Sequence, residues 1–398
     1  MCIAGQARAR DKNILPSYSV HLDAARALAA LVVFVGHGTF LFLHTSVHQL
    51  AHDPSTQLGA AVPSHELADH THLGHQAVIV FFVLSGYFVG GGALRAVRNR
   101  QWSTKLYLFQ RLTRLWIVLI PALLLGVLMD TVGVRLFSNT SPIYAGLYGP
   151  VSRSVWNVIP FRLAASTFTG NAFFLQGILV PCFGTNGPLW SLSYEFWYYI
   201  MFPLLLTGIA FSTRMPRRIC SIVGLIAILI FCGQNISLYF LIWMMGALTS
   251  CLPMGISQSL AHRITPWACA LFAAFNLYAV AFPFNLIASD FDTGIFFSLV
   301  LWLLLHFRQP AGESIYRNVS TRLSAMSYTL YTVHYPIILF LSVLLVPKLP
   351  GPYSSLHSIG FLLVAYVATF SIAYLFYRCF EANTVRVRRI LTARLETL

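Results

Sequence analysis

The sequence predicts an all-α integral membrane protein with about ten transmembrane helices and both termini in the cytoplasm. Hydrophobic residues make up 57% of the 398-residue chain, charged residues only 10%, and the mean hydropathy is +0.70. A soluble globular protein carries about 25% charged residues, and a disordered chain is poor in apolar residues. The composition therefore excludes both classes and indicates a chain that is solvated mostly by lipid.

A helix needs about 20 mostly apolar residues to cross a bilayer. Along the chain, ten segments are predicted to do so: 22–43, 76–94, 115–133, 189–211, 219–235, 238–252, 267–284, 292–307, 325–346 and 357–380. The first run is too long for a signal peptide and is read as a retained span. This divides the chain into a cytoplasmic N-terminal segment (1–21), one transmembrane domain (22–380) and a basic cytoplasmic tail (381–398).

The basic residues fix the predicted orientation. The chain has 26 Lys and Arg against 12 Asp and Glu. With ten spans and a cytoplasmic N-terminus, 21 of these 26 cations fall on the cytoplasmic side and four in outer loops. That distribution follows the positive-inside rule, so the excess indicates topology and no nucleic-acid partner. Residues 163–181 are predicted to be re-entrant or interfacial, because a full crossing there would turn the later basic loops outward.

The first span carries the most informative polar residues. Asp23, Arg26 and His37 lie on one narrow helical stripe, because Arg26 and His37 are eleven residues, or just over three turns, apart. The stripe has a cation near the cytoplasm and a histidine, which can act as a base near neutral pH, toward the outer face. An interfacial ion pair and an ordinary core histidine are the alternative interpretation.

A second set of histidines lies in the predicted outer loop 44–75. Its members are His44, His48, His52, His65, His70, His72 and His75. The first three have i,i+4 spacing, which suits a metal on one helix face, but the set matches no recognised ligand pattern. A solvated polar loop or a lid is favoured, and no metal site is predicted.

Further candidates lie at the ends of later spans. Arg111 and Arg114 share a face at a cytoplasmic mouth and suit phosphate binding, although positive-inside anchoring also explains them. Glu195 follows Trp190 and Ser193 near the outer end of the fourth span, where a carboxylate is expected to orient a histidine, bind a hydroxyl or pair with an arginine.

The ninth span and the second span add two more features. Tyr331 and His334 recur at i,i+3 spacing and are expected to line a cavity or to form a packed core stripe. Ser85–Gly86 is predicted to be a close helix-packing site, with a serine nucleophile as the weaker interpretation.

Several of these motifs occur together and in order, and the chain resembles the acyltransferase-3 family of polytopic membrane acyltransferases. The resemblance rests on Arg26 and His37 (R-x10-H), FFVLSGYF at 81–88, Arg111 and Arg114 (R-x-x-R), LWSLSYE ending at Glu195, and YTLYTVHYP with Tyr331 and His334. The resemblance covers residues 20–382. The family includes bacterial O-antigen and exopolysaccharide O-acetyltransferases. The resemblance implies a multi-pass protein of the bacterial inner membrane.

The resemblance also implies a reaction and roles for the residues. An acyl group, usually acetyl, passes from acetyl-CoA, a co-substrate and no tightly bound cofactor, to a hydroxyl of a carbohydrate or glycolipid. His37 is expected to be the general base, Glu195 to orient it or the acceptor, and Arg26 to act beside them and to continue the positive lining. Arg111 and Arg114 are expected to bind the phosphates of the acyl-CoA.

Four residues are assigned to the oxyanion and the acceptor: Ser193, Tyr331, His334 and Trp190. Direct transfer is predicted, with a covalent intermediate on Ser85 or His37 as the alternative. A transporter that uses the same intramembrane polar residues is the competing class of protein.

Overall fold

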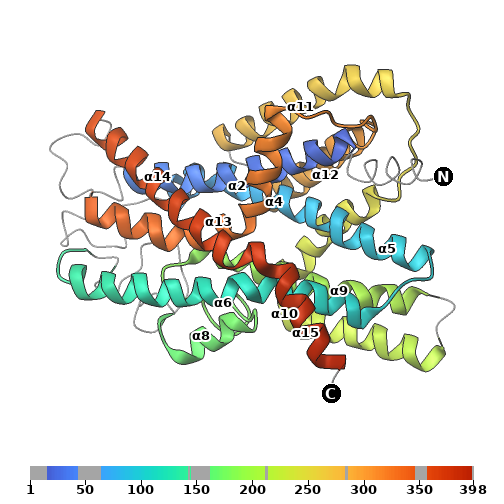
Figure 1. Cartoon of the computed structure of the whole chain (residues 1–398), viewed down its shortest axis with the longest axis horizontal. Coiled ribbons are helices and arrows are strands. Elements are labelled where there is room, and N and C mark those ends of the chain that lie inside the picture. Colours follow the sequence, from blue (N-terminus) through green and yellow to red (C-terminus); the bar gives the residue numbers. More distant parts are fainter. Residues whose placement is uncertain are drawn as a thin grey trace, which may run out of the picture.

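The computed structural model describes residues 16–43, 64–141, 144, 162–210, 214–282, 286–345 and 356–396. These residues form a bundle of long helices without a β-strand; within them only two isolated β-bridges occur. The elements are α2 (Ser17–Leu43), α4 (Ser64–Ser85), η2 (Gly86–Gly90), α5 (Gly91–Arg98), α6 (Thr104–Phe137), α8 (Ala165–Ala172), η3 (Gly187–Leu189), α9 (Trp190–Ile209), α10 (Met215–Thr249), α11 (Gln258–Ala281), α12 (Leu286–Leu304), α13 (Ile315–Leu345), α14 (Leu356–Cys379), η5 (Glu381–Asn383) and α15 (Thr384–Glu396) (Figure 1).

The all-α class and the membrane character are confirmed. Within the described ranges, seven helical segments are long and apolar enough to cross a bilayer. They are Ser17–Leu43, Leu73–Arg98, Thr104–Phe137, Met215–Thr249, Ile287–Leu304, Ile315–Leu345 and Leu356–Thr392.

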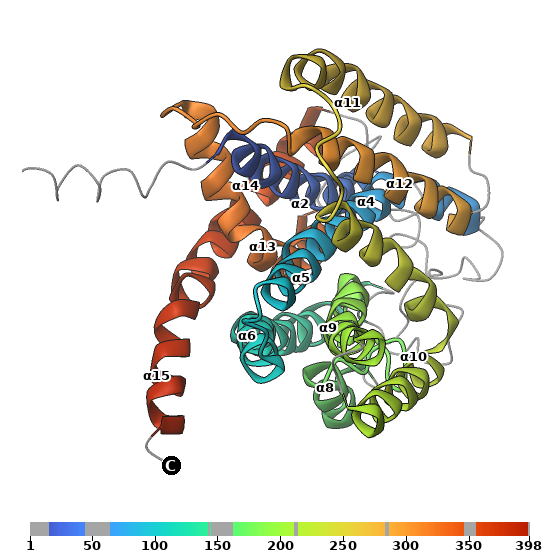
Figure 2. The same cartoon turned by 90° about the vertical axis from the view of Figure 1, so that its right-hand side faces the viewer.

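Two groups of helices share the apolar core. One is centred on α4, α9, α10 and α12, and the other on α2, α13 and α14. Helix α2 joins them, because it packs against both α4 and α13, and Figure 2 shows it in the middle of the bundle. The polar stripe of the first span therefore faces its neighbours at the centre of the molecule.

The two predicted spans 219–235 and 238–252 belong to one element, α10, which bends at Gly233. Gly233 has φ +78°, a conformation that favours glycine. Ser237 Oγ donates a hydrogen bond to the carbonyl of Leu229 at 3.0 Å. Eight residues of straight helix would separate these two positions by about 12 Å, so the chain turns sharply here, a few residues before the predicted break.

Two other segments refine the predicted boundaries. Helix α4 begins at Ser64, inside the predicted outer loop, because apolarity marks the membrane-embedded part of a helix and not its start. Helix α8 has only eight residues, or about 12 Å, which is too short to cross a bilayer. This agrees with the re-entrant or interfacial prediction for 163–181.

Candidate active site

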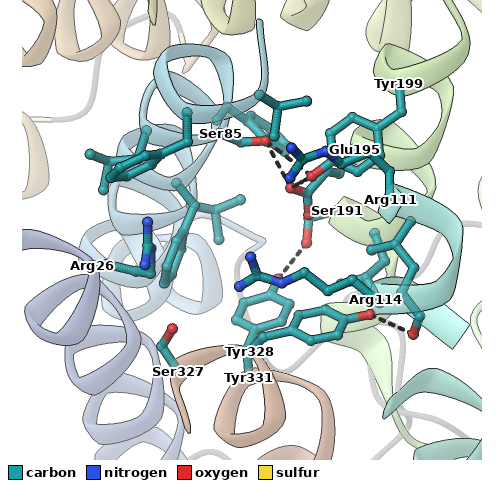
Figure 3. A pocket seen from close by; sticks show the side chains of 18 of the residues that line it. Arg26, Ser85, Arg111, Arg114, Ser191, Glu195, Tyr199, Ser327, Tyr328 and Tyr331 are labelled. Atoms are coloured by element: carbon teal, nitrogen blue, oxygen red, sulfur yellow. Dashed lines mark hydrogen bonds between the residues drawn. The ribbon is translucent and has the colours of Figure 1, made fainter. Parts of the chain in front are cut away.

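A cavity of about 440 Å³ lies where α2, α4, α6, α9 and α13 meet. Figure 3 shows side chains from these helices converging on it. Its lining includes five ionisable groups of opposite signs: Asp23, Arg26, Arg111, Arg114 and Glu195. Three guanidiniums against two carboxylates give the cavity a positive balance, which suits an anionic ligand.

Arg26 is held against one wall of the cavity. Its Nη1 donates to Ser324 Oγ at 3.0 Å and lies 3.4 Å from Asp23 Oδ1. Ser324 Oγ in turn donates to the same Asp23 oxygen at 2.8 Å. The guanidinium also stacks over the ring of Phe88, 4.5 Å from its centroid, a favourable cation–π contact. These contacts fix Arg26 while it still lines the cavity.

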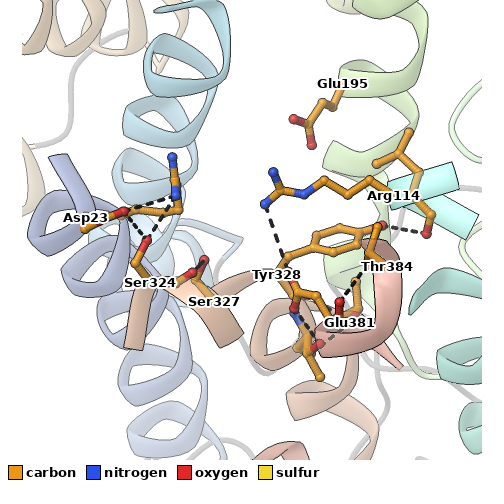
Figure 4. Close-up of polar contacts among 12 residues, drawn as sticks. Asp23, Arg114, Glu195, Ser324, Ser327, Tyr328, Glu381 and Thr384 are labelled. Atoms are coloured by element: carbon orange, nitrogen blue, oxygen red, sulfur yellow. Dashed lines mark hydrogen bonds and ion pairs between the residues drawn. The ribbon is translucent and has the colours of Figure 1, made fainter. Parts of the chain in front are cut away.

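Arg111 and Arg114 line the opposite wall, on α6. Arg114 is 4.0 Å from the carboxylate of Glu381, which is held by the backbone N–H and the hydroxyl of Thr329 at 3.1 and 2.7 Å. Figure 4 shows this anchored pair across the cavity from Asp23. Arg111 Nε is buried and has no hydrogen-bond partner among the described residues, so Arg111 retains a donor for a ligand.

Glu195 is the centre of a hydrogen-bond network on α4, α9 and α10. Its Oε1 accepts from Ser85 Oγ at 2.8 Å and from the Tyr199 hydroxyl. Trp243 Nε1 donates to Ser85 Oγ at 3.1 Å. Ser85 is the last residue of α4, directly before the π-helical turn η2, a feature frequent at functional sites. The network orients the carboxylate toward the cavity beside Arg111 (Figure 3).

Tyr331 lines the cavity on the side of α13. Its hydroxyl is within 2.7 Å of Ser191 Oγ and donates to the Pro188 carbonyl at 2.9 Å. Its ring packs 6.1 Å from that of Phe81, which also lines the cavity. The Tyr331 side chain is only 7% exposed, and His334, one turn further along α13, does not line the cavity.

His37 and His334 lie beyond this tyrosine. The ring of His334 is 6.0 Å from that of Tyr331, and its Nε2 is 2.9 Å from His37 Nδ1. His334 Nδ1 faces the carbonyls of Leu330 and Tyr331 at 3.0 and 2.9 Å. Because carbonyls only accept, that nitrogen carries the proton, and His334 Nε2 accepts from His37 Nδ1–H. The remaining nitrogen of His37, Nε2, is then the one with a free lone pair.

A family model matches most of the chain. The model of the acyltransferase-3 family, described as an acyltransferase domain, matches residues 20–378. The chain belongs to the acyltransferase-3 family.

Other comparisons are weaker. Acyltransferase MdmB of Streptomyces mycarofaciens is 29% identical over 184 residues, which cover 46% of this chain and 38% of that protein. The chain thus spans well under half the length of that curated relative. No solved structure matches the chain.

Within this acyltransferase domain, the structure brings five of the predicted site residues to one cavity. They are Arg26, Arg111, Arg114, Glu195 and Tyr331. His37 and His334 do not line the cavity but adjoin it behind Tyr331.

Two predicted acceptor residues lie elsewhere. Ser193 is fully buried and donates to the Phe174 carbonyl at 2.8 Å, so it holds the connection between α8 and α9. Trp190 stacks on His75, with ring centroids 5.7 Å apart. Neither residue lines the cavity, and the roles first assigned to them stay predictions.

Of the histidine set, His75 has described partners. His75 Nε2 is 2.8 Å from the fully buried carboxylate of Asp290, which also accepts from Tyr239 and Gln76. His44, His48 and His52 lie outside the described residues. Among the residues that the structure describes, no group of three His, Cys, Asp or Glu side chains is placed to hold a metal.

The sequence did not predict three partners of the lining residues, namely Tyr199, which bonds Glu195, Trp243, which bonds Ser85, and Glu381, which pairs with Arg114. Tyr199 follows Glu195 by one helical turn, and that spacing was a usable signal. Trp243 and Glu381 are distant in sequence, and only helix packing brings them to the site.

Proposed function

We propose that the protein is a membrane O-acyltransferase that moves an acyl group, most simply acetyl, from acyl-CoA to a hydroxyl of a cell-surface carbohydrate or glycolipid. Family membership supports acyl transfer. The observation that carries the finer assignment is the cavity with Arg26, Arg111 and Arg114 in its lining, because coenzyme A presents several phosphate charges that guanidiniums bind well.

The proposed topology suits transfer from a cytoplasmic donor to an acceptor at the outer face. We propose ten spans with both termini in the cytoplasm of a bacterial inner membrane, in which α10 supplies two short spans on either side of Gly233 and α9 and α11 one each. Arg111 and Arg114 then lie at the cytoplasmic end of α6, where acyl-CoA is available. His37 is about 16 Å further along α2 than Arg26, toward the outer face and a surface glycan.

The chemistry needs a base and a route. His37 Nε2 takes the hydroxyl proton while the hydroxyl oxygen attacks the thioester carbonyl. The new C–O bond forms, the C–S bond breaks, and the proton passes to the coenzyme A thiolate. His334 holds the tautomer of His37 that presents this lone pair. Acyl-CoA is a co-substrate here, and transfer within a ternary complex needs no covalent enzyme intermediate.

The position of Tyr331 sets a condition on this mechanism. The thioester end of the donor has to pass the Tyr331 layer to reach His37, so the hydrogen bonds of Tyr331 to Ser191 and Pro188 break when the donor binds. These bonds lie between neutral groups and are worth about 1 kcal/mol each, which donor binding readily offsets.

The decisive experiment uses the full chain in membrane vesicles with radiolabelled acetyl-CoA and cell-envelope glycan. Label is expected in the glycan for the wild type, with a loss of at least 100-fold for His37→Ala. His357→Ala, which replaces an exposed histidine on α14, is the matched control and should retain activity.

The other outcomes separate the alternatives. Wild-type transfer by His37→Ala would overturn the assigned base. Label that stays on the protein without acceptor would indicate a covalent intermediate on Ser85 or His37. Uptake into vesicles without any transfer would identify a transporter.

A further inference from the structure

The predicted tail of the protein is a helix that packs against the arginine side of the cavity. Helix α15 begins where Thr384 Oγ1 donates to the Glu381 carbonyl at 2.6 Å, and Glu381 is the partner of Arg114. The helix contacts α6 and runs on from α14 toward the C-terminus (Figures 1 and 2). Arg388 Nη2 donates to the carbonyl of Gln110, the residue before Arg111.

Two guanidiniums at this junction each have a donor that is unpartnered among the described residues. Arg388 Nε and Arg111 Nε are both buried, and neither has a hydrogen-bond partner in the described part of the chain. A buried donor without a partner costs about 1–3 kcal/mol. Here two such atoms lie on arginines that meet at Gln110, so acceptor groups supplied by a ligand would satisfy them.

The local charge leads to the same conclusion. Arg388 contacts the backbone of Gln110, so its charge lies near those of Arg111 and Arg114 and is repelled by both. Glu381 is the carboxylate paired with Arg114, at the 4.0 Å limit of an ion pair. Like charges held together are destabilising unless an anion lies among them, and a phosphate presents several acceptor oxygens to guanidinium groups.

We propose that Arg388, with Arg111 and Arg114, forms a three-arginine site that binds phosphate groups of the acyl donor, so that α15 is part of the donor site. This rests on the proposed function. Arg111 and Arg114 line the cavity while Arg388 does not. The phosphorylated end of the donor therefore lies at the mouth between α6 and α15, and its unphosphorylated arm extends inward past Glu195.

The test measures ligand binding to the full chain in phosphatidylcholine nanodiscs. For coenzyme A, Arg388→Gln should raise the Kd about 10-fold or more, since a charge-assisted contact is lost. Arg386→Gln, an exposed arginine on the same helix, is the matched control and should bind like the wild type. Pantetheine, which has no phosphate, should bind to both variants with the same Kd.

Each contrary result has its own meaning. If Arg388→Gln binds coenzyme A as well as Arg386→Gln does, the assignment of Arg388 is overturned while the proposed function stands. If Arg388→Gln weakens the binding of coenzyme A and of pantetheine equally, Arg388 only holds α15 in place and the inference fails. If the wild type does not bind coenzyme A at all, the proposed function itself fails.

A lipid headgroup has the same chemistry, so a second arm distinguishes it. Phosphatidylglycerol nanodiscs should leave the Kd of coenzyme A for the wild type within about twofold, at ionic strength high enough to screen surface charge. If phosphatidylglycerol greatly raises the Kd of coenzyme A for the wild type but not for Arg388→Gln, the site binds lipid phosphate and the proposal is overturned.

Discussion

The histidine pair shows how backbone carbonyls determine the state of a side chain two steps away. The carbonyls of Leu330 and Tyr331 fix the proton on His334 Nδ1, and this fixes the proton on His37. His334 is fully buried, so its role in the proposed reaction is to position His37 and not to contact the substrate.

We therefore expect His334→Ala to lower kcat about 10- to 100-fold, the usual effect of losing an orienting partner, with little change in the KM for acetyl-CoA. Initial rates at varied acetyl-CoA concentrations measure both constants. His306→Ala removes another buried histidine and serves as the control. An unchanged kcat for His334→Ala would show that His37 does not need this partner.

The arginines on α6 lead to the opposite kinetic pattern. Arg111→Glu should raise the KM for acetyl-CoA at least 10-fold and leave kcat nearly unchanged, because the lost interaction binds a part of the donor that does not react. Arg135→Glu, near the end of the same helix, is the control. Equal KM values for the two variants would return Arg111 to a role in membrane anchoring.

At the scale of elements, the end of α4 with the turn η2 approaches α10 closely at two glycines, Gly86 and Gly246. A Cβ on Gly86 would lie 1.9 Å from the Trp243 carbonyl oxygen, and one on Gly246 would lie 1.8 Å from that of Val83. The atoms in the way belong to backbone, which cannot rotate aside. This close crossing confirms the predicted helix-packing site at Ser85–Gly86 and places Trp243 within reach of Ser85.

Gly246→Ala should accordingly destabilise the protein by about 1–3 kcal/mol or more, because overpacking forces the two helices apart. A lower midpoint of thermal unfolding in detergent would show it. Gly360→Ala is the control, since a Cβ there meets nothing within 4 Å in the described structure. Equal midpoints for the two variants would mean that the helices separate without cost.

Sequence periodicity predicted contacts within an element better than contacts between elements. The stripe on the first span is confirmed, because Arg26 and His37 both contact α13, through Ser324 and His334. By contrast, the bond from Ser85 to Glu195 joins residues 110 positions apart. Such pairs depend on how helices cross and on their relative register, which no local pattern encodes.

The tail is the clearest example of this limit. Its basic composition predicts a cytoplasmic location but does not reveal that Arg388 reaches the backbone of Gln110, 278 positions earlier. Apolarity likewise predicts the membrane-embedded stretch of α4 but not its start at Ser64.

At the scale of the whole molecule, the proposed ten-span topology makes a simple prediction. A reporter fused after Leu398 should be active only if it functions in the cytoplasm, since the basic loops stay inside. A fluorescent protein that fails to fold in the periplasm, compared with alkaline phosphatase at the same position, gives the readout. Phosphatase activity at this position would show that the topology is the inverse of the proposed one, with the arginines on the side of the membrane that lacks acyl-CoA.

The tyrosine between the cavity and the histidine pair has a consequence for the cell. A continuous water-filled passage lined by charged groups would let protons leak and dissipate the gradient that an energised membrane maintains. Tyr331, packed against Phe81 and bonded to Ser191, would interrupt such a passage between the cavity and the histidine pair. In the proposed reaction the donor breaks these hydrogen bonds but itself occupies the space beside Tyr331, so that a proton leak need not accompany acyl transfer.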